Sequence, residues 1–390
     1  MVKNRCLWAL WLLGIGMLYL FKNDIEARII LIASFFIPAL LIIFAWIAVR
    51  KVDASLEVPE VCGKGTSVGG KIMIRNGSIL PALRVSCTIK CQNMLTGERK
   101  EEKLRIVLMT KGEKCLSFDA GSDYCGKLHI SIADCRLRDM FGLSAWKLKP
   151  PAEKTLVVVA ETFEPQVTIV ENVNAIIDSD TYSMTKSGSD PSETFAIREY
   201  VPGDSIKSIH WKLSQKSESL MVREYGFPII NQILLLFEAS CLAEYGIPTP
   251  KQTDAMAEAF LSISASLAKQ GIFHTIGWRH SESGLFISHE IRFMEELDAV
   301  TEEFLSNTVM VGQMTTIGCY RKFYDQCAYG HVAIVSSYVE PDIDMLFNGN
   351  RINVLNCIVN SVKDAVCPNS IQQVLFSDSN YREDLGRLEL

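Results

Sequence analysis

The sequence predicts two N-terminal transmembrane helices, then an antiparallel β-sandwich, then an α/β domain with a mostly parallel sheet. Three observations indicate this architecture. Two long apolar runs open the chain, and residues 52–150 alternate apolar and polar in several short stretches. Beyond residue 226, continuous apolar runs typical of buried strands alternate with amphipathic helical patterns. The predicted regions are 1–51, 52–150, a connecting region 151–226, and 227–390.

The two apolar runs, residues 6–21 and 29–49, are predicted to cross the membrane as a helical hairpin. As a helix the second run would be about 31 Å long, which is enough to cross the hydrocarbon core. The first would reach only about 24 Å, so a short span and a signal-peptide core are both open. No small-x-small cleavage site follows the first run, and the short connector 22–28 favours the hairpin.

A hairpin returns the chain to the side of the membrane on which it started. More basic residues flank the hairpin than lie in its connector: Lys3, Arg5, Arg50 and Lys51 against Lys22 and Arg28. This bias predicts a multi-pass protein of the cell membrane whose large C-terminal part is cytoplasmic. The 12 cysteines include no Cys-x-x-Cys pair, which favours reduced thiols over a disulfide framework or a zinc site.

Residues 52–150 carry the period-two pattern of half-buried strands. Val85, Cys87 and Ile89 illustrate it, and Asn76-Gly77 is one of the turn signals between such runs. Cys87 and Cys91 fall on the same strand face, so we expect both to be small core hydrophobes. Pro150-Pro151 marks the end of this region.

The C-terminal region is expected to alternate strands and helices. The strands are expected at Ile229–Phe237, Gly271–Trp278, Val332–Ser336 and Asn353–Val359, and the helices at Thr253–Gln270 and Phe293–Leu305. The net charge of −6, without any basic tract, argues against nucleic acid as a partner.

One segment between these regions combines a turn, a short helix and two large aromatic residues. Pro202 and Gly203 suit the two central positions of a type II turn. Asp204 is expected to cap a short helix that begins at Ser205. Trp211 should end that helix before a strand over 220–225.

The spacing of this segment resembles the bacterial family called domain of unknown function 58, whose hallmark is Arg-x-Tyr-x-Pro-Gly-Asp, then a basic residue, Ile, x, Trp and Ser. The matching residues are Arg198, Tyr200, Pro202, Gly203, Asp204, Lys207, Ile209, Trp211 and Ser214, with 222–224 continuing the pattern. We call residues 198–214 the hallmark loop.

A second segment, 139–143, resembles the Asp-Pro-Phe-Gly-Leu that closes the β region of the same family. Met140 replaces the proline. Without the family, Phe141 and Leu143 would be interpreted as core residues on either side of a tight glycine turn.

The resemblance implies that the α/β domain is similar to the von Willebrand factor type A fold. In that fold the first strand leads into an Asp-x-Ser-x-Ser loop that helps to hold a divalent cation. The corresponding residues are Glu238, Ser240 and Leu242. Leu242 offers no oxygen to a hard cation, so we expect a degenerate site, with no metal and no cofactor.

The resemblance also implies association with MoxR-type AAA+ ATPases and with transglutaminase-like membrane proteins. We therefore expect a non-enzymatic, membrane-anchored adaptor that acts in envelope or complex-assembly processes. Tyr200 and Trp211 are the candidate partner anchors, although each could equally brace the loop against the sheet. Basic residues in this region are expected to be solvated or internally paired rather than to form an anion site: Arg198, Lys207, Lys212, Lys216 and Arg223.

The alternative is a hydrolase-like, envelope-associated enzyme. Asp204 would then orient His210, with Ser214 or Ser217 as the nucleophile. The sequence contains neither a Gly-x-Ser-x-Gly elbow nor a phosphate-binding glycine loop that would support this hypothesis.

Overall fold

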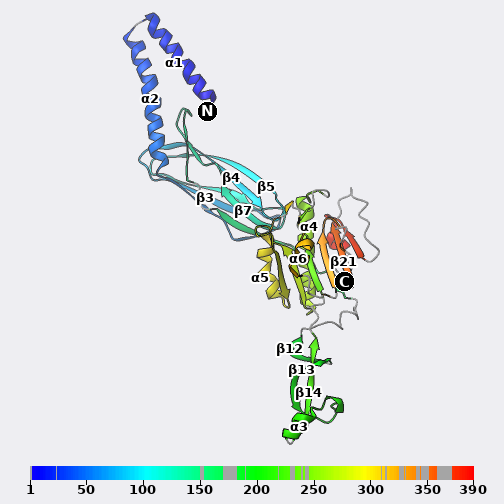
Figure 1. The fold of residues 1–390 in the computed structure, drawn as a ribbon. Helices are drawn as coiled ribbons and strands as arrows, with labels where there is room; N and C mark the ends of the chain where they lie inside the picture. The colour runs from blue at the N-terminus through cyan, green and yellow to red at the C-terminus, as the bar shows by residue number, and fades with distance from the viewer. Residues whose placement is uncertain are drawn as a thin grey trace. The chain divides into compact units, whose positions relative to one another are not determined.

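The computed structural model describes most of the chain, and its elements are drawn in Figure 1. The described residues are 2–22, 24–149, 153–169, 182–188, 190–217, 219–228, 233–238, 240–241, 246–308, 310–311, 314–324, 329, 331–339, 343, 351–357 and 371–390. Two compact units are present. One comprises Met1–Glu161 with Leu305–Asn307, and the other Thr162–Phe304 with Thr308–Leu390.

The predicted pair of N-terminal apolar helices is confirmed. They are α1 (Val2–Lys22) and α2 (Ile25–Val49), and both are long and apolar enough to cross a membrane. Trp8 joins them, because its Nε1 donates to the carbonyl of Ser34 at 3.4 Å and its ring meets Phe35 edge-on at 6.0 Å. Most other apolar side chains of the two helices are exposed, as expected for surfaces that face lipid rather than protein.

The rest of the first unit consists of two sheets. The three-stranded sheet has the order β1 (Val52–Glu57), β3 (Val68–Asn76), β6 (Glu113–Ala120). The other has the order β2 (Val61–Gly63), β10 (Lys154–Val159), β7 (Gly126–Ile132), β4 (Ala82–Asn93), β8 (Arg136–Arg138), β9 (Ala145–Lys147), with β5 (Arg99–Leu108) also paired to β4. The pairings are antiparallel except that of β2 with β10, which is parallel.

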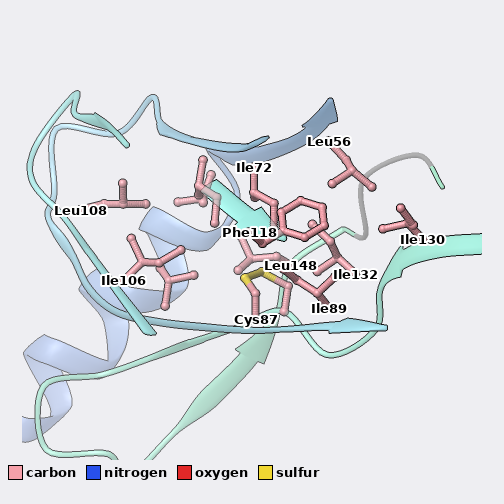
Figure 2. Packing of buried hydrophobic residues seen from close by; sticks show 14 of the residues in the cluster. Leu56, Ile72, Cys87, Ile89, Ile106, Leu108, Phe118, Ile130, Ile132 and Leu148 are labelled. Atoms are coloured by element: carbon pink, nitrogen blue, oxygen red, sulfur yellow. A yellow bond between two sulfur atoms is a disulfide. The ribbon is translucent and has the colours of Figure 1, made fainter. Parts of the chain in front are cut away.

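Both sheets contribute to one apolar core, which Figure 2 shows from close by. Ile72 and Phe118 come from the three-stranded sheet, and Ile89 and Ile130 from the other. Along β7, buried and half-buried residues alternate strictly, as the period-two pattern predicted.

The expectation that Cys87 is a reduced core thiol is wrong. The structure joins Cys87 of β4 to Cys135 in a disulfide (Figure 2). The sequence spacing hid this bond because the two residues are 48 positions apart and meet only when β8 pairs with β4. Seven described cysteines are free: Cys6, Cys62, Cys91, Cys115, Cys125, Cys319 and Cys357. Cys91 is half-buried, and burial raises its thiol pKa.

The second unit contains a six-stranded sheet whose strands run parallel except for one edge. Its order is β18 (Phe286–Ile291), β17 (His274–Arg279), β15 (Ile233–Phe237), β20 (His331–Ser336), β21 (Arg351–Cys357), β22 (Ile371–Phe376). Only the pairing of β18 with β17 is antiparallel. The ends of two predicted strands, residues 229–232 and 358–359, lie outside the described residues.

Helices cover both faces of this sheet. Phe237 of β15 contacts Phe260 of α4 (Pro250–Lys269) and Phe304 of α5 (Met294–Leu305). Leu234 and Leu236 point to the opposite face, where they share a cluster with α6 (Thr316–Tyr324). Shorter elements complete the unit: β11 (Gln166–Thr168) with β23 (Arg387–Glu389), β16 (Ser240–Cys241) with β19 (Met310–Val311), and α8 (Tyr381–Asp384).

The hallmark loop belongs to a separate small sheet with the order β12 (Tyr182–Gly188), β14 (Met221–Pro228), β13 (Asp190–Glu199). The loop leaves β13, forms the short 3₁₀ helix η2 (Ile206–Ser208) and then α3 (Trp211–Ser217), and returns as β14. Figure 1 shows α3 at the end of this sheet. A folded scaffold of three strands therefore carries the loop.

Candidate functional site

A three-residue ion-pair cluster closes the hallmark loop. Arg198 donates from Nη1 and Nη2 to the two carboxylate oxygens of Asp204, at 2.6 and 2.7 Å. Its Nε donates to Glu224 of β14 at 2.7 Å. Hydrogen bonds from Arg198 and then from the Val201 amide hold the pKa of Asp204 down to about 2. We call Arg198, Asp204 and Glu224 the clamp.

The clamp corrects the prediction that Asp204 caps a helix. Ser205, not Asp204, precedes η2, and it makes no side-chain capping hydrogen bond. Asp204 instead points back and accepts the Val201 N–H at 2.8 Å. The charge of Arg198 attracts the carboxylate more strongly than a short 3₁₀ helix does, because bidentate, charge-assisted hydrogen bonds are among the strongest.

The predicted turn at Pro202-Gly203 has the expected geometry. The Asp204 N–H donates to the carbonyl of Val201 at 3.0 Å, which places Pro202 and Gly203 at the two central positions. Gly203 has a φ of +116°, and nothing lies within 4 Å of where its Cβ would be. The backbone angle, not crowding, therefore favours glycine here.

Trp211 begins a helix rather than ending one, contrary to the prediction. The reason is that Ile209 is extended and bridges to Val222, which separates η2 from α3. His210 precedes α3, and its Nδ1 accepts the Leu213 N–H at 3.3 Å, so His210 caps this second helix.

Ser214 and Ser217 are both engaged in the backbone. Ser214 Oγ donates to the carbonyl of His210 at 3.1 Å and accepts the Met221 N–H at 2.9 Å, which ties α3 to β14. Ser217 Oγ donates to the carbonyl of Leu213 at 3.0 Å. The residues that the hydrolase alternative would use thus all have structural partners. Asp204 belongs to the clamp, His210 caps α3, and Ser214 and Ser217 donate to backbone carbonyls.

The loop exposes large apolar side chains beside lysines. Ile206 is 70% exposed and Trp211 is 61% exposed, and Val201 is also exposed. Lys207 and Lys212 are exposed next to them in the sequence. We call these five residues the loop tip. Tyr200 is half-buried, and its backbone N–H donates to the carbonyl of Leu220 at 2.8 Å, so Trp211 is the more accessible of the two candidate anchors.

Glu238, which the resemblance places at a degenerate cation site, has protein partners for its carboxylate. Glu238 follows β15 and is only 2% exposed. Its carboxylate accepts the Thr316 N–H at 2.7 Å and the Thr316 hydroxyl at 3.1 Å. Ser240 lies in the short strand β16, and Leu242 lies outside the described residues. Within the part of the chain that the structure describes, no three His, Cys, Asp or Glu side chains gather as metal ligands.

Sequence reasoning missed Thr316 because it is 78 residues from Glu238. The only sequence signal is a Thr315-Thr316 pair before an amphipathic helix, which is typical of a helix start. The carboxylate of Glu238 then lies at the first amide of α6, where the helix dipole favours negative charge.

The hallmark loop lies within a segment that matches a known protein family. Residues 196–277 match the model of the family described as "Protein of unknown function DUF58". The match contains the whole hallmark loop and continues through β15 and α4 into β17. The resemblance to this family that the sequence predicted is therefore confirmed over these residues. No curated protein matches the chain.

Several solved structures are similar to parts of the chain at low scores. The CARDB domain of the PF1109 protein from Pyrococcus furiosus is 16% identical, covers 28% of this chain and 94% of its own, and has a TM-score of 0.23. The DNA glycosylase AlkC of Pseudomonas fluorescens is 11% identical, with coverages of 28% and 31% and a TM-score of 0.22. A β-glucosidase from Listeria innocua is 12% identical, with coverages of 28% and 16% and a TM-score of 0.19.

Proposed function

We propose that this DUF58 protein is a non-enzymatic, membrane-anchored adaptor that binds a partner protein through its hallmark loop. The observation that carries this proposal is the pairing of a clamped turn with an exposed tryptophan. Arg198 and Asp204 hold the loop, and Trp211 is 61% exposed on it. Tryptophan is enriched among the residues that dominate binding energy, and a loop that is already ordered loses little entropy when it binds.

The charges of the loop indicate the chemistry of the partner. The clamp neutralises Arg198 with Asp204 and Glu224, so the excess positive charge comes from other residues. These are exposed, and no ion pair involves them among the described residues: Lys207, Lys212, Lys216 and Arg223. An apolar pocket with an acidic rim would complement this surface. We propose that a MoxR-type AAA+ ATPase supplies it, with a transglutaminase-like membrane protein as a further partner.

The anchor in this proposal is the α1–α2 hairpin, with both helices in the bilayer and the C-terminal part in the cytoplasm. The length and apolar surface of the two helices support the anchor. The basic residues that flank the hairpin support the orientation.

A von Willebrand factor type A-like domain is the second part of the proposal. Numbered along the chain from β15, the sheet has the order 3-2-1-4-5-6, and only its third strand, β18, is antiparallel. Helices cover both faces, as in doubly wound folds. In our proposal this domain presents the hallmark loop to the ATPase.

Co-purification of the ATPase with the full chain tests the adaptor role. Trp211→Ala and Lys207→Glu should each weaken binding by about 2 kcal/mol, or roughly 30-fold, while the melting temperature is nearly unchanged. Phe293→Ala and Lys114→Glu are matched controls, because Phe293 is an exposed aromatic residue and Lys114 an exposed lysine outside the loop. Retention of the partner by both loop variants would contradict the proposal. So would loss of binding that occurs only together with unfolding.

A further inference from the structure

The loop between β8 and β9 is held in one shape by a buried carboxylate. Asp139 is only 2% exposed and accepts the backbone N–H groups of Phe141, Leu143 and Ser144 at 3.1, 3.2 and 2.5 Å. It also accepts the Ser144 hydroxyl at 2.8 Å. Asp139 is thus fully used inside the loop, and it leaves no accessible negative charge there.

The first turn of α1 contacts this loop. Asn4 Nδ2 donates to the carbonyl of Phe141 at 2.8 Å, and Arg5 Nε donates to the carbonyl of Leu143 at 2.8 Å. Gly142 lies between them with a φ of +70°, and a Cβ at this position would lie 2.8 Å from Asn4 Nδ2. The loop and the start of the apolar hairpin therefore meet in a close, hydrogen-bonded contact.

Three arginines lie on the elements that form or adjoin this contact. Arg84 of β4 and Arg138 of β8 are direct cross-strand partners, and both are exposed. A Cβ on Gly142 would lie 3.6 Å from Arg84 Nη1, so the Arg84 side chain reaches the β8–β9 loop. Arg5 contacts the same loop from α1. Within the described residues, none of the three arginines has an ion-pair partner. Like charges directly opposite each other destabilise a sheet, so an anion between them would relieve the repulsion.

An apolar crevice begins at the same loop. It has a volume of about 620 Å³ and lies between α1 and α2. Its lining includes Trp8, Trp11, Ile37, Pro38, Phe141 and Leu143. The crevice therefore joins the spanning helices to the loop that Arg5 and Arg84 reach.

Further apolar side chains are exposed near the end of α2. Gly77 donates its N–H to the carbonyl of Lys51 at 2.8 Å, which places this turn beside the helix end. Asn76 Nδ2 in turn donates to the carbonyl of Met109 at 3.1 Å. Ile79 and Met109 are exposed in these turns, as Met140 is in the β8–β9 loop. Exposed apolar residues beside helix ends are typical of a surface that sits in the membrane interface.

We propose that this junction is a binding site for one anionic phospholipid. The phosphate lies among Arg5, Arg84 and Arg138, and an acyl chain enters the crevice between α1 and α2. Arginine suits this role because its planar group binds phosphate oxygens with two hydrogen bonds. The site rests on the proposed membrane anchor, since the crevice reaches lipid only if both helices are in the bilayer.

The test uses the full chain in nanodiscs that contain equal amounts of phosphatidylcholine and phosphatidylglycerol. After gentle detergent extraction, mass spectrometry measures the lipid that stays with the protein. The wild type should retain phosphatidylglycerol roughly tenfold over phosphatidylcholine, because each interfacial basic residue attracts anionic lipid. R84Q combined with R138Q should lower this enrichment roughly tenfold. K71Q combined with R99Q removes the same charge far along the strands, where Lys71 pairs with Glu57 at the end of β1 and Arg99 with Gln92 near the end of β4. This control should leave the enrichment unchanged.

A second variant tests the crevice without touching the arginines. A33W places an indole in the lining between the helices and should reduce retained phosphatidylglycerol, even if the double arginine variant fails to fold. Equal retention of the two lipids by the wild type overturns the site, as does displacement of the lipid by inorganic phosphate alone. A chain that does not enter nanodiscs contradicts the anchor as well, whereas one that enters without lipid preference contradicts only the lipid site.

Discussion

Arg198 holds Asp204 through two parallel hydrogen bonds of 2.6 and 2.7 Å, across the turn that Pro202 and Gly203 form. The same guanidinium reaches Glu224 on β14, so one side chain ties together the strand that enters the loop, the turn and the strand that leaves it. The Arg and the Asp of the family hallmark are thus partners in one clamp. The hallmark is a stability device for the loop as well as a candidate interface.

Replacing Asp204 with Asn should loosen the hallmark loop. Asn cannot give Arg198 two charged oxygens, so the amide of Val201 should exchange its hydrogen faster than in the wild type. Hydrogen-exchange mass spectrometry on the full chain measures this. Glu199→Gln is the control, because Glu199 is an exposed carboxylate beside the clamp. Unchanged exchange at Val201 would show that the turn holds itself without the clamp.

The clamp also predicts an acid transition. The pKa of Asp204 is lowered to about 2 in the folded protein, from an ordinary 3.8. Because the folded pKa is the lower one, the contribution of this carboxylate is fully present above about pH 4 and is lost as the pH falls through about 2. Hydrogen exchange of the hallmark-loop amides in the wild type should therefore rise toward the rate of Asp204→Asn only between about pH 4 and pH 2. A rise near neutral pH would contradict the assignment.

Replacing Asp139 with Ala should destabilise the first unit by about 3 kcal/mol. The change leaves the amides of Phe141, Leu143 and Ser144 without their acceptor, and hydrogen bonds to a charged group contribute more than neutral ones. Denaturant unfolding of the full chain in detergent micelles measures the loss. Asp134→Ala is the control, since that carboxylate is half-exposed and pairs with Arg136 at the surface. Equal effects of the two variants would contradict the role assigned to Asp139.

His274 should make the second unit sensitive to mild acid. It is fully buried, with Nε2 at 2.7 Å from Ser264 Oγ and Nδ1 at 3.0 Å from the carbonyl of Ile272. Burial lowers its pKa below the ordinary 6.5. The unfolded chain therefore binds the proton first, and the stability contribution is present above about pH 6.5 and is lost as the pH falls below it.

The melting temperature of the second unit, followed by near-ultraviolet circular dichroism, checks this. At pH 7.5, His274→Gln should have a lower melting temperature than the wild type. Between pH 7.5 and pH 5.5, its melting temperature should fall less than that of the wild type. These pH values lie roughly one unit on either side of the ordinary histidine pKa and therefore bracket the transition. His280→Gln is the matched control, because His280 lies in a surface turn beside Ser283. An identical acid response in the wild type and in His274→Gln would mean that another group carries the transition.

The compartment of the C-terminal part can be measured with a reporter fused after Leu390. We expect activity of a cytoplasmic reporter, from the charge bias around the hairpin. The Cys87–Cys135 bridge favours an oxidising compartment, whereas the seven cysteines that are free among the described residues favour a reducing one. Maleimide labelling in cells, with and without reductant, should be compared with a Cys87→Ser variant. Reporter activity only outside the cytoplasm would overturn the orientation.

The full chain should bind magnesium or manganese weakly, with a dissociation constant above about 0.1 mM. The carboxylate of Glu238 already accepts two hydrogen bonds from Thr316, and Leu242 offers no oxygen. Isothermal titration calorimetry measures the affinity, and Glu238→Gln is the comparison. Tighter binding that Glu238→Gln abolishes would show that the cation displaces Thr316.

The sequence by itself determined the elements whose cause is local. Two long apolar runs predicted the N-terminal helices, and both are present because length and hydropathy suffice to specify them. Alternating and continuous apolar runs predicted the strand-rich body that follows. Proline and glycine set the turn of the hallmark loop, because each restricts or frees its own backbone angle. The spacing of nine residues was enough to indicate the family that residues 196–277 match.

Only the tertiary structure decided which partner each polar group takes. Asp204 had a helix start beside it in the sequence, yet a guanidinium six residues away holds it, because the strand and the turn bring the two together. Glu238 and Thr316 are 78 residues apart, and Asn4 and Phe141 are 137 apart. Hydrogen bonds and ion pairs act over a few ångströms. Residues that are far apart in the sequence come that close only after the strands have paired into sheets. The clamp, the Glu238–Thr316 contact and the junction at Gly142 therefore appear only in the folded molecule.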